Sequence, residues 1–105
     1  MAVKKKYQLT ASARADLRDI KEYTVEVWGT AQAKKYLADI RKTLSILAAN
    51  PLAGSDRPDT RDGARGYPYK RHVIYYAIVK NHIIVFGILN KTMLPKPHLT
   101  DREIL

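Results

Sequence analysis

The spacing of apolar residues predicts two amphipathic helices in the first half of the chain. From residue 11 to 28, and again from 30 to 49, apolar or small residues recur at intervals of three and four. That period places them on one face of a helix, which we expect to be buried against a sheet. The first stripe comprises Ala13, Leu17, Ile20, Thr24 and Val27, and the second comprises Ala33, Leu37, Ile40, Leu44 and Leu47.

The ends of both helices carry local signals. Thr10 and Thr30 each precede a stripe, and a threonine hydroxyl can accept a hydrogen bond from the free amides of a first helical turn. Gly29 supplies a left-handed stop between the helices. Asn50–Pro51 ends the second helix, because the residue before a proline avoids the helical region. So short a link between the helices predicts an antiparallel helical hairpin.

Strand patterns lie on either side of this hairpin. A short strand is expected at residues 4–9. After a polar loop at 51–63, three more strands are expected at 64–69, 71–79 and 83–89. The last of these is a near-continuous apolar run, which is typical of a strand in the middle of a sheet.

The order of these elements predicts the fold class. Strand, helix, helix, strand, strand, strand indicates an α+β domain, β-α-α-β-β-β, with the helical hairpin packed on a mainly antiparallel sheet. A single domain spans residues 1–105. A C-terminal tail at about 91–105 leaves the sheet, and its prolines, Pro95 and Pro97, hold it extended.

Smaller features also follow from local patterns. Lys80–Asn81 forms a short turn between the last two strands, where asparagine tolerates positive φ. Thr100 and Glu103 fit a capping box for one final helical turn.

The aromatic residues extend the predicted core. Tyr75 and Tyr76 are neighbours on a strand and therefore project to opposite faces. We expect one of them to pack against the helices and the other to be exposed, where it can stack on a base or anchor a protein partner. Trp28, at the end of the first helix, is expected in the core.

The second half of the chain is basic and lacks carboxylates. The whole chain carries 19 Lys+Arg and 10 Asp+Glu, for a net charge of +9, yet no Asp or Glu occurs between residues 63 and 100. A basic, aromatic sheet is suited to an acidic partner, either a protein or nucleic acid. The stretch holds all three histidines and six cations: Arg65, Lys70, Arg71, Lys80, Lys91 and Lys96.

Several classes of function find no support in the sequence. The absence of cysteine excludes disulfides and thiolate chemistry and suits a reducing cytoplasm, where we expect the protein to act. Three scattered histidines do not form a zinc motif, and no glycine-rich phosphate loop is present, so we expect neither a metal nor a cofactor. The basic N-terminus lacks a signal peptide's apolar segment, and no apolar run approaches about 18 residues, so no membrane partner is expected.

Residues spread along nearly the whole chain carry a family resemblance. They are, in order, Leu9-Thr10, Ala15-Asp16-Leu17-Arg18-Asp19-Ile20, Tyr23, Trp28-Gly29, Gln32-Ala33, Tyr36, Leu47-Ala48, Asn50-Pro51, Gly54, Arg61, Gly63, Arg65, His72-Val73-Ile74, Tyr76, Ile88-Leu89 and Met93. This ordered set resembles the ParE/RelE superfamily of bacterial toxins, and the ParE branch in particular. The resemblance implies the toxin of a type II toxin–antitoxin module, a kind of module that stabilises plasmids, neutralised by a small acidic ParD-like antitoxin.

The superfamily supports two activities. ParE-type toxins inhibit DNA gyrase by binding it, whereas RelE-type toxins cleave mRNA in the ribosome. The ParE pattern commonly has a histidine after Ile-Leu and an acidic residue after the methionine, and this chain has Asn90 and Leu94 there. RNA cleavage needs a base, cations and an acid. The nearby cations are Arg65, Lys70 and Arg71, but Asn90 can act neither as acid nor as base.

We therefore predict no catalytic residues and a non-enzymatic poison that binds gyrase. Two alternatives stay open: a RelE-type, ribosome-dependent mRNA endonuclease and a basic binding module without toxicity. His72 stands where ribonuclease relatives tend to place an arginine. Its ring either packs or hydrogen-bonds within the sheet or serves as a base.

The predicted contact residues fall into two sets. Acidic antitoxin residues should meet Arg65, Lys70, Arg71 and Lys91, while apolar antitoxin anchors fill a groove beside the helical hairpin. We expect a hetero-oligomer with the antitoxin, and no sequence-specific DNA binding by the toxin alone. The target should meet the end of the last strand and the tail, through Asn90, Lys91, Met93, Leu94, Lys96 and His98.

Overall fold

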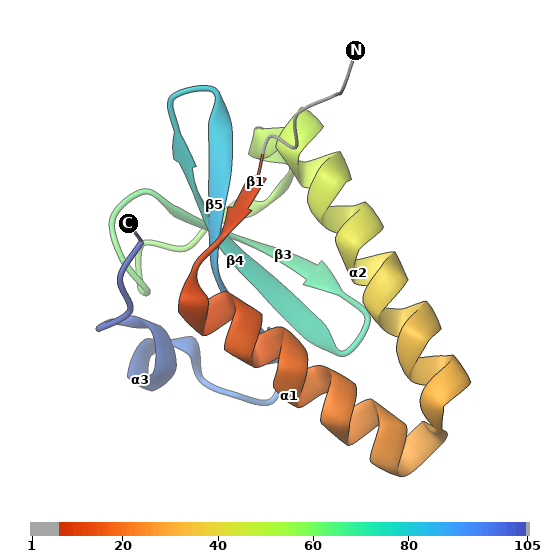
Figure 1. The fold of residues 1–105 in the computed structure, drawn as a ribbon. Helices are drawn as coiled ribbons and strands as arrows, with labels where there is room; N and C mark the ends of the chain where they lie inside the picture. Colours follow the sequence, from red (N-terminus) through yellow and green to blue (C-terminus); the bar gives the residue numbers. More distant parts are fainter. Residues whose placement is uncertain (1–6, 105) are drawn as a thin grey trace.

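A five-stranded mixed sheet carries a long helical hairpin on one face (Figure 1). The computed structural model describes residues 7–104, so the predicted strand residues 4–6 lie outside it. The elements are β1 (Tyr7–Leu9), α1 (Ala11–Trp28), α2 (Thr30–Ala49), a 3-10 turn η1 (Pro51–Ala53), β2 (Ser55–Asp56), β3 (Ala64–Tyr69), β4 (His72–Val79), β5 (His82–Asn90) and α3 (Pro95–Leu99). The strand order is β1-β5-β4-β3-β2, with β1 parallel to β5 and every other pair antiparallel. The predicted α+β fold is confirmed.

The first predicted helix has the expected bounds, and the second ends as expected but begins one residue early. The Thr10 hydroxyl accepts a hydrogen bond from the Ala13 amide at 3.1 Å, so the first predicted cap is confirmed. The second is wrong, because Gly29 occupies the N-cap of α2 and Thr30 is already helical. Gly29 has φ 93° and ψ 167°, a positive φ with extended ψ rather than the left-handed helical conformation expected. Glycine adopts this backbone without the steric cost of a Cβ.

The main core lies between the hairpin and the sheet. Every residue of the α2 stripe is buried, and so are the first four residues of the α1 stripe. Val27 is half exposed, contrary to expectation, because the last turn of α1 runs past the sheet (Figure 1). On the sheet side, Tyr76 is fully buried, and its hydroxyl donates to the Pro51 carbonyl at 2.6 Å and accepts from the Gly54 amide at 2.9 Å. These two hydrogen bonds tie the loop after α2 to the core.

A second, smaller core covers the opposite face of the sheet. Tyr75 is buried there, so the prediction that one of the paired tyrosines is exposed is wrong. α3 lies over this face and brings Leu99 into contact with Gly87, where an added Cβ would sit only 2.5 Å from a Leu99 methyl carbon. The register shifts by one residue between Tyr75 and Tyr76, opposite Phe86, which marks a β-bulge.

The loops and the tail differ most from expectation. The predicted loop at 51–63 contains η1 and the two-residue strand β2, which pairs with β3. The tail is not extended, because Pro95 opens α3 and proline is favoured in a first helical turn. Thr100 ends that helix instead of starting one. In the turn between β4 and β5, Lys80 rather than Asn81 takes the positive φ, at 55°.

Candidate functional site

The first candidate surface is a groove between α1 and α2, which we call the helical groove. Its volume is about 410 Å³. Leu17, Ala33 and Leu37 form an apolar floor, because they belong to the buried stripes of the two helices. Five cations next to the stripes form the rim of the groove: Arg14, Arg18, Lys21, Lys34 and Arg41.

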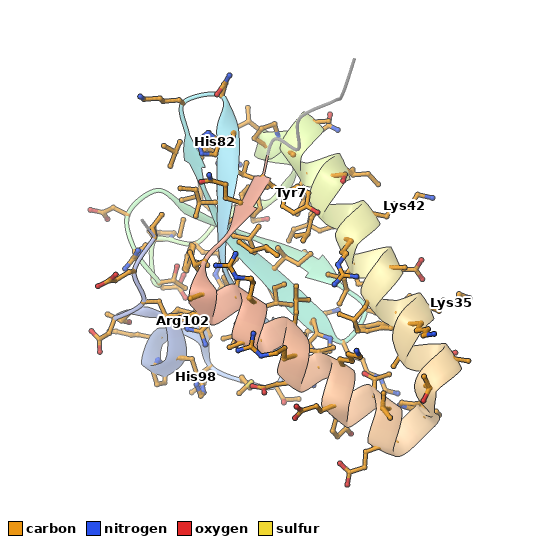
Figure 2. The ribbon with its side chains drawn as sticks, in the orientation of Figure 1. Tyr7, Lys35, Lys42, His82, His98 and Arg102 are labelled. Atoms are coloured by element: carbon orange, nitrogen blue, oxygen red, sulfur yellow. The ribbon has the colours of Figure 1, made fainter. Side chains whose placement is uncertain are left out.

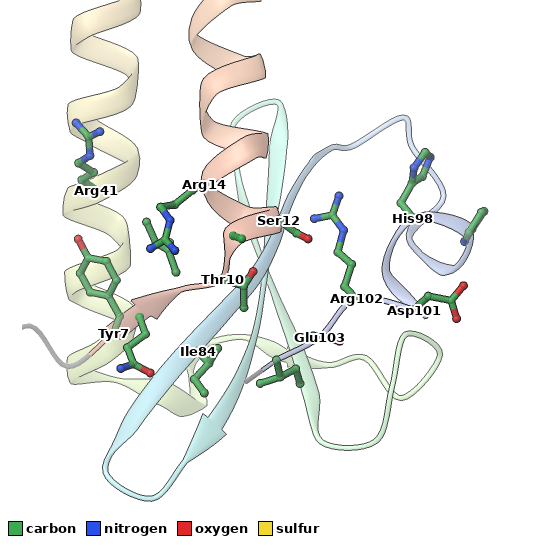
Figure 3. Close-up of a pocket in the computed structure, with 15 residues that line it drawn as sticks. Tyr7, Thr10, Ser12, Arg14, Arg41, Ile84, His98, Asp101, Arg102 and Glu103 are labelled. Atoms are coloured by element: carbon green, nitrogen blue, oxygen red, sulfur yellow. The ribbon is translucent and has the colours of Figure 1, made fainter.

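A second cavity adjoins the first along the edge of the sheet, and we call it the edge cavity. It has a volume of about 1090 Å³ and is lined by β1, the first residues of α1 and the C-terminal tail (Figure 3). Leu9, Arg14 and Arg41 line both cavities, so the two lie side by side next to β1. β1 is the outermost strand on this side of the sheet, and an edge strand can pair with an extended segment of a partner.

The third surface is a basic–aromatic patch where the turn between β3 and β4 meets the two helices. The Arg71 guanidinium lies 5.7 Å from the centre of the Trp28 ring. The Lys70 ammonium lies 5.6 Å from the centre of the Tyr69 ring. The Lys91 amide donates to the Arg71 carbonyl at 2.8 Å, which holds the end of β5 beside this turn. The patch comprises Trp28, Tyr36, Tyr69, Lys70, Arg71, His72 and Lys91.

Trp28 belongs to this surface and not to the core. Its side chain is 57% exposed, so the prediction that it is buried is wrong. The helical hairpin extends past the sheet at this end (Figure 1), and no strand lies beneath the tip of α1. The guanidinium of Arg71 covers part of the ring instead.

His72 sits at the inner side of the patch. Its Nδ1 lies 2.7 Å from the Tyr36 hydroxyl, and the ring centre of Tyr36 is 5.9 Å from that of Tyr69. Burial lowers the pKa of His72, and the charge of Arg71 lowers that pKa further. Burial also raises the pKa of Tyr36. The pair is therefore neutral near pH 7, and the partner of His72 comes from α2 rather than from within the sheet.

The structure separates Arg65 from the other cations predicted to meet an antitoxin. Arg65 is the second residue of β3, whereas Lys70 follows its far end. The Arg65 guanidinium donates to the Gly54 carbonyl at 3.0 Å, the Leu52 carbonyl at 3.2 Å and the Asp56 carboxylate at 2.8 Å. All three of its nitrogens are thus engaged within the chain, whereas Lys70, Arg71 and Lys91 come together in the basic–aromatic patch.

The residues predicted to meet the target lie at the end of β5, on the exposed turn that follows it, and on α3. The Asn90 side-chain oxygen accepts from the amide and the hydroxyl of Thr92 at 2.9 and 2.8 Å, which closes the turn after β5. The turn leaves Met93 and Leu94 exposed, Leu94 by 73%. Lys91, Lys96 and His98 are exposed as well.

Comparison with known proteins identifies the family of this chain. Residues 7–95 match the family model described as the ParE toxin of the type II toxin–antitoxin system parDE. The chain belongs to the ParE toxin family. It is 32% identical over 95 residues to Toxin ParE1 of Caulobacter vibrioides, covering 90% of this chain and 98% of that one. It is also 32% identical over 97 residues to Toxin ParE of Escherichia coli, covering 91% of this chain and 94% of that one.

A solved ParDE structure agrees with this assignment. The chromosomal ParDE toxin–antitoxin system from P. aeruginosa superimposes with a TM-score of 0.70 at 26% identity, covering 81% of this chain and 94% of that one. The resemblance to the ParE branch is therefore confirmed. Within the described residues of this ParE-family chain, no helix is long and apolar enough to cross a membrane. Residues 7–104 also contain no group of three or more side chains suited to hold a metal ion.

One structural feature of this ParE-family chain had no signal in the sequence. The Arg102 guanidinium pairs with both carboxylate oxygens of Asp16 and donates to the Phe86 carbonyl at 3.1 Å. Asp16 in turn accepts from the Ile88 amide at 2.9 Å. β1 pairs with β5 only as far as Val85, so these side chains satisfy the backbone of β5 beyond the end of β1. The ion pair also anchors the tail to α1.

Proposed function

We propose that the chain is the toxin of a type II module that inhibits DNA gyrase by binding it, and that an acidic ParD-like antitoxin neutralises it in the cytoplasm. The observation that carries the antitoxin contact is that the helical groove and the edge cavity adjoin and share Leu9, Arg14 and Arg41 in their linings. An apolar floor with a basic rim is complementary to an amphipathic helix with one acidic face. A segment that is extended beside β1 and helical between α1 and α2 would fill both parts.

The energetic roles of floor and rim differ. Apolar anchors that enter between Leu17 and Leu37 would supply most of the affinity, because buried contacts near the centre of an interface dominate binding energy. The rim cations would raise the association rate by attracting carboxylates. Acidic residues of the same antitoxin would also reach Lys70, Arg71 and Lys91. Arg65 is already engaged within its own chain, so we assign the acidic contact to the other three.

The test of the antitoxin contact compares two variants of equal charge. Arg18→Gln/Lys21→Gln/Lys34→Gln removes three rim cations, and Lys35→Gln/Lys42→Gln/Lys80→Gln removes three exposed cations elsewhere. Lys35 and Lys42 project from the side of α2 that faces away from α1 (Figure 2). The rim variant should lower the association rate with the cognate antitoxin about tenfold, and the control variant should change it little. Equal effects of the two variants would show that net charge alone attracts the antitoxin.

The proposal that the target is gyrase rests on the family and on the exposed turn after β5. Leu94 offers an apolar anchor beside Lys91, and an exposed apolar side chain of this size suits a protein contact. Leu94→Ala should weaken inhibition of DNA supercoiling by purified gyrase. Leu52→Ala is the matched control, because Leu52 is 74% exposed on η1, away from this turn.

A second test separates the gyrase inhibitor from the nuclease. His72→Ala should not abolish inhibition of gyrase as long as the protein folds. Cutting of mRNA on translating ribosomes, lost in His72→Ala or Arg71→Ala, would favour the nuclease instead.

A further inference from the structure

We propose that the basic–aromatic patch binds single-stranded DNA without sequence preference, with bases stacked on Trp28 and phosphates held by Lys70, Arg71 and Lys91. Proteins that hold single strands combine cations along the backbone with exposed aromatic rings for the bases. The patch contains both kinds of group on adjoining elements. The inference rests in part on the proposed function, because gyrase is an enzyme that acts on DNA.

The cations of the patch are available to phosphates. The ion pairs within residues 7–104 join Arg57 to Asp59, Arg65 to Asp56 and Arg102 to Asp16. Lys70, Arg71 and Lys91 have no carboxylate partner in that part of the chain. Lys70 and Arg71 lie against aromatic rings instead, and a cation on a ring face keeps donors that a phosphate can use.

The backbone brings these cations together. Lys70 and Arg71 form the two-residue turn between β3 and β4, with Lys70 at φ 51°. The hydrogen bond from the Lys91 amide to the Arg71 carbonyl adds the end of β5. In Figure 1 this turn lies in the angle between α1 and α2. From it, the Arg71 guanidinium reaches to 5.7 Å from the centre of the Trp28 ring.

The rings of the patch explain why its partner differs from that of the helical groove. The groove has an aliphatic floor, which suits the apolar side chains of a protein helix. The patch instead presents the ring of Trp28, which is 57% exposed. It also contains Tyr36, whose ring packs against those of Tyr69 and His72. A ring face stacks on any unpaired base, whereas paired bases in a duplex are already stacked. This chemistry favours a single strand over a duplex and over a protein.

The same cations would serve two opposing partners. Acidic residues of the antitoxin and phosphates of the DNA would compete for Lys70, Arg71 and Lys91. Antitoxin bound to the toxin should therefore release the strand. Bound antitoxin would then block both the contact with DNA and the contact with gyrase.

The experiment uses the isolated full-length chain, without gyrase or antitoxin. Trp28 is the only tryptophan of the protein, so its fluorescence reports stacking directly. Labelled 12-nucleotide DNA, its duplex and the same sequence as RNA are titrated by fluorescence anisotropy at low and moderate salt. The single DNA strand should bind most tightly and quench the tryptophan. Tighter binding of the duplex or of the RNA, or binding without quenching, would overturn the proposal.

Matched variants separate the patch from the overall charge. Trp28→Ala should weaken binding of the single strand about tenfold, whereas Tyr23→Ala should not, although Tyr23 is 58% exposed on the same helix. Log affinity falls as log salt rises, and Lys70→Gln/Arg71→Gln/Lys91→Gln should make this slope shallower by about 2. That change is expected for three lost phosphate contacts. The Lys35/Lys42/Lys80 control should keep the wild-type slope. Equal losses in both triple variants would refute the proposal, and this result is independent of whether the protein inhibits gyrase.

Discussion

At the scale of single residues, tertiary contacts decide which charges are available to a partner. Arg65 and Arg71 both lie in the stretch without carboxylates, and the sequence alone treats them alike. Arg65 proves to be engaged by the loop that precedes its strand, and the path of that loop has no periodic pattern to predict it. The pair of Asp16 and Arg102 is equally hidden, because 86 positions separate the two residues. Local patterns cannot register contacts at such a distance.

The Asp16–Arg102 pair supports a prediction about stability. Asp16→Asn should lower the free energy of unfolding by about 1–3 kcal/mol, because it leaves the partly buried guanidinium without its counter-charge. Asp59→Asn is the control, since its pair with Arg57 is exposed and such pairs contribute about 0–1 kcal/mol. Urea unfolding followed by circular dichroism measures both. Equal changes in the two variants would mean that the Asp16–Arg102 pair contributes no more than an exposed pair.

His72 leads to a prediction about pH. Burial holds its folded-state pKa below the value of about 6.5 in an unfolded chain, so the unfolded state binds more protons just below pH 6.5. The stability that neutral His72 contributes is therefore complete above that pH and is lost as the pH falls below it. His72→Gln should flatten the fall in unfolding free energy between about pH 7 and 5. Tyr36→Phe, which keeps the imidazole, should retain a pH-dependent fall. Identical pH profiles for the wild type and His72→Gln would contradict this assignment.

At the scale of elements, the helices are predicted well because several signals agree along each of them. α1 has the predicted bounds and α2 differs only in its first residue, because the apolar period, Gly29 and Pro51 all mark the same limits. β3 also has the predicted bounds. β2 and α3 were not expected, because each depends on a neighbour: β2 pairs with β3, and α3 packs Leu99 against Gly87. Trp28 lies at an element's end, where the helical period continues but the sheet does not. A pattern predicts which face a residue occupies but not what covers that face.

The α2 stripe gives the prediction that belongs to this scale. Ile40 and Leu44 are fully buried between the hairpin and the sheet. Ile40→Ala and Leu44→Ala should each cost about 2–5 kcal/mol of unfolding free energy, through lost burial and the cavity left behind. Val27→Ala, on the overhanging end of α1, should cost far less. The unfolding free energies of the three variants are obtained from their urea midpoints, with the same dependence of free energy on urea concentration as the wild type. Comparable losses at all three sites would show that the hairpin tip is buried against something else.

At the scale of the whole molecule, the surfaces share one sign of charge but differ in shape. The net charge of +9 attracts any polyanion, so charge alone cannot select between an antitoxin and DNA. The helical groove adds an aliphatic floor between two helices, and the basic–aromatic patch adds an exposed ring at the hairpin tip. The sequence predicted an acidic partner from the missing carboxylates. All three patch cations come from the stretch without carboxylates, whereas the groove cations come from the first half of the chain, where Asp and Glu are interspersed. The missing carboxylates therefore indicated the patch but not the groove.

This division leads to a kinetic prediction for antitoxin binding. Raising the salt concentration from about 50 to 200 mM shortens the screening length, so the association rate constant should fall severalfold. The dissociation rate constant should change much less, because apolar anchors in the helical groove are insensitive to screening. Leu37→Ala removes an apolar side chain from the groove floor. This variant should dissociate from the antitoxin faster than the wild type, while its association rate constant keeps the wild-type dependence on salt. Stopped-flow association and dissociation by competition measure the two constants separately, and the folded state of the variant is checked by its unfolding curve. If the association rate constant is the same at both salt concentrations, the cations of the basic rim do not attract the antitoxin and the prediction is wrong.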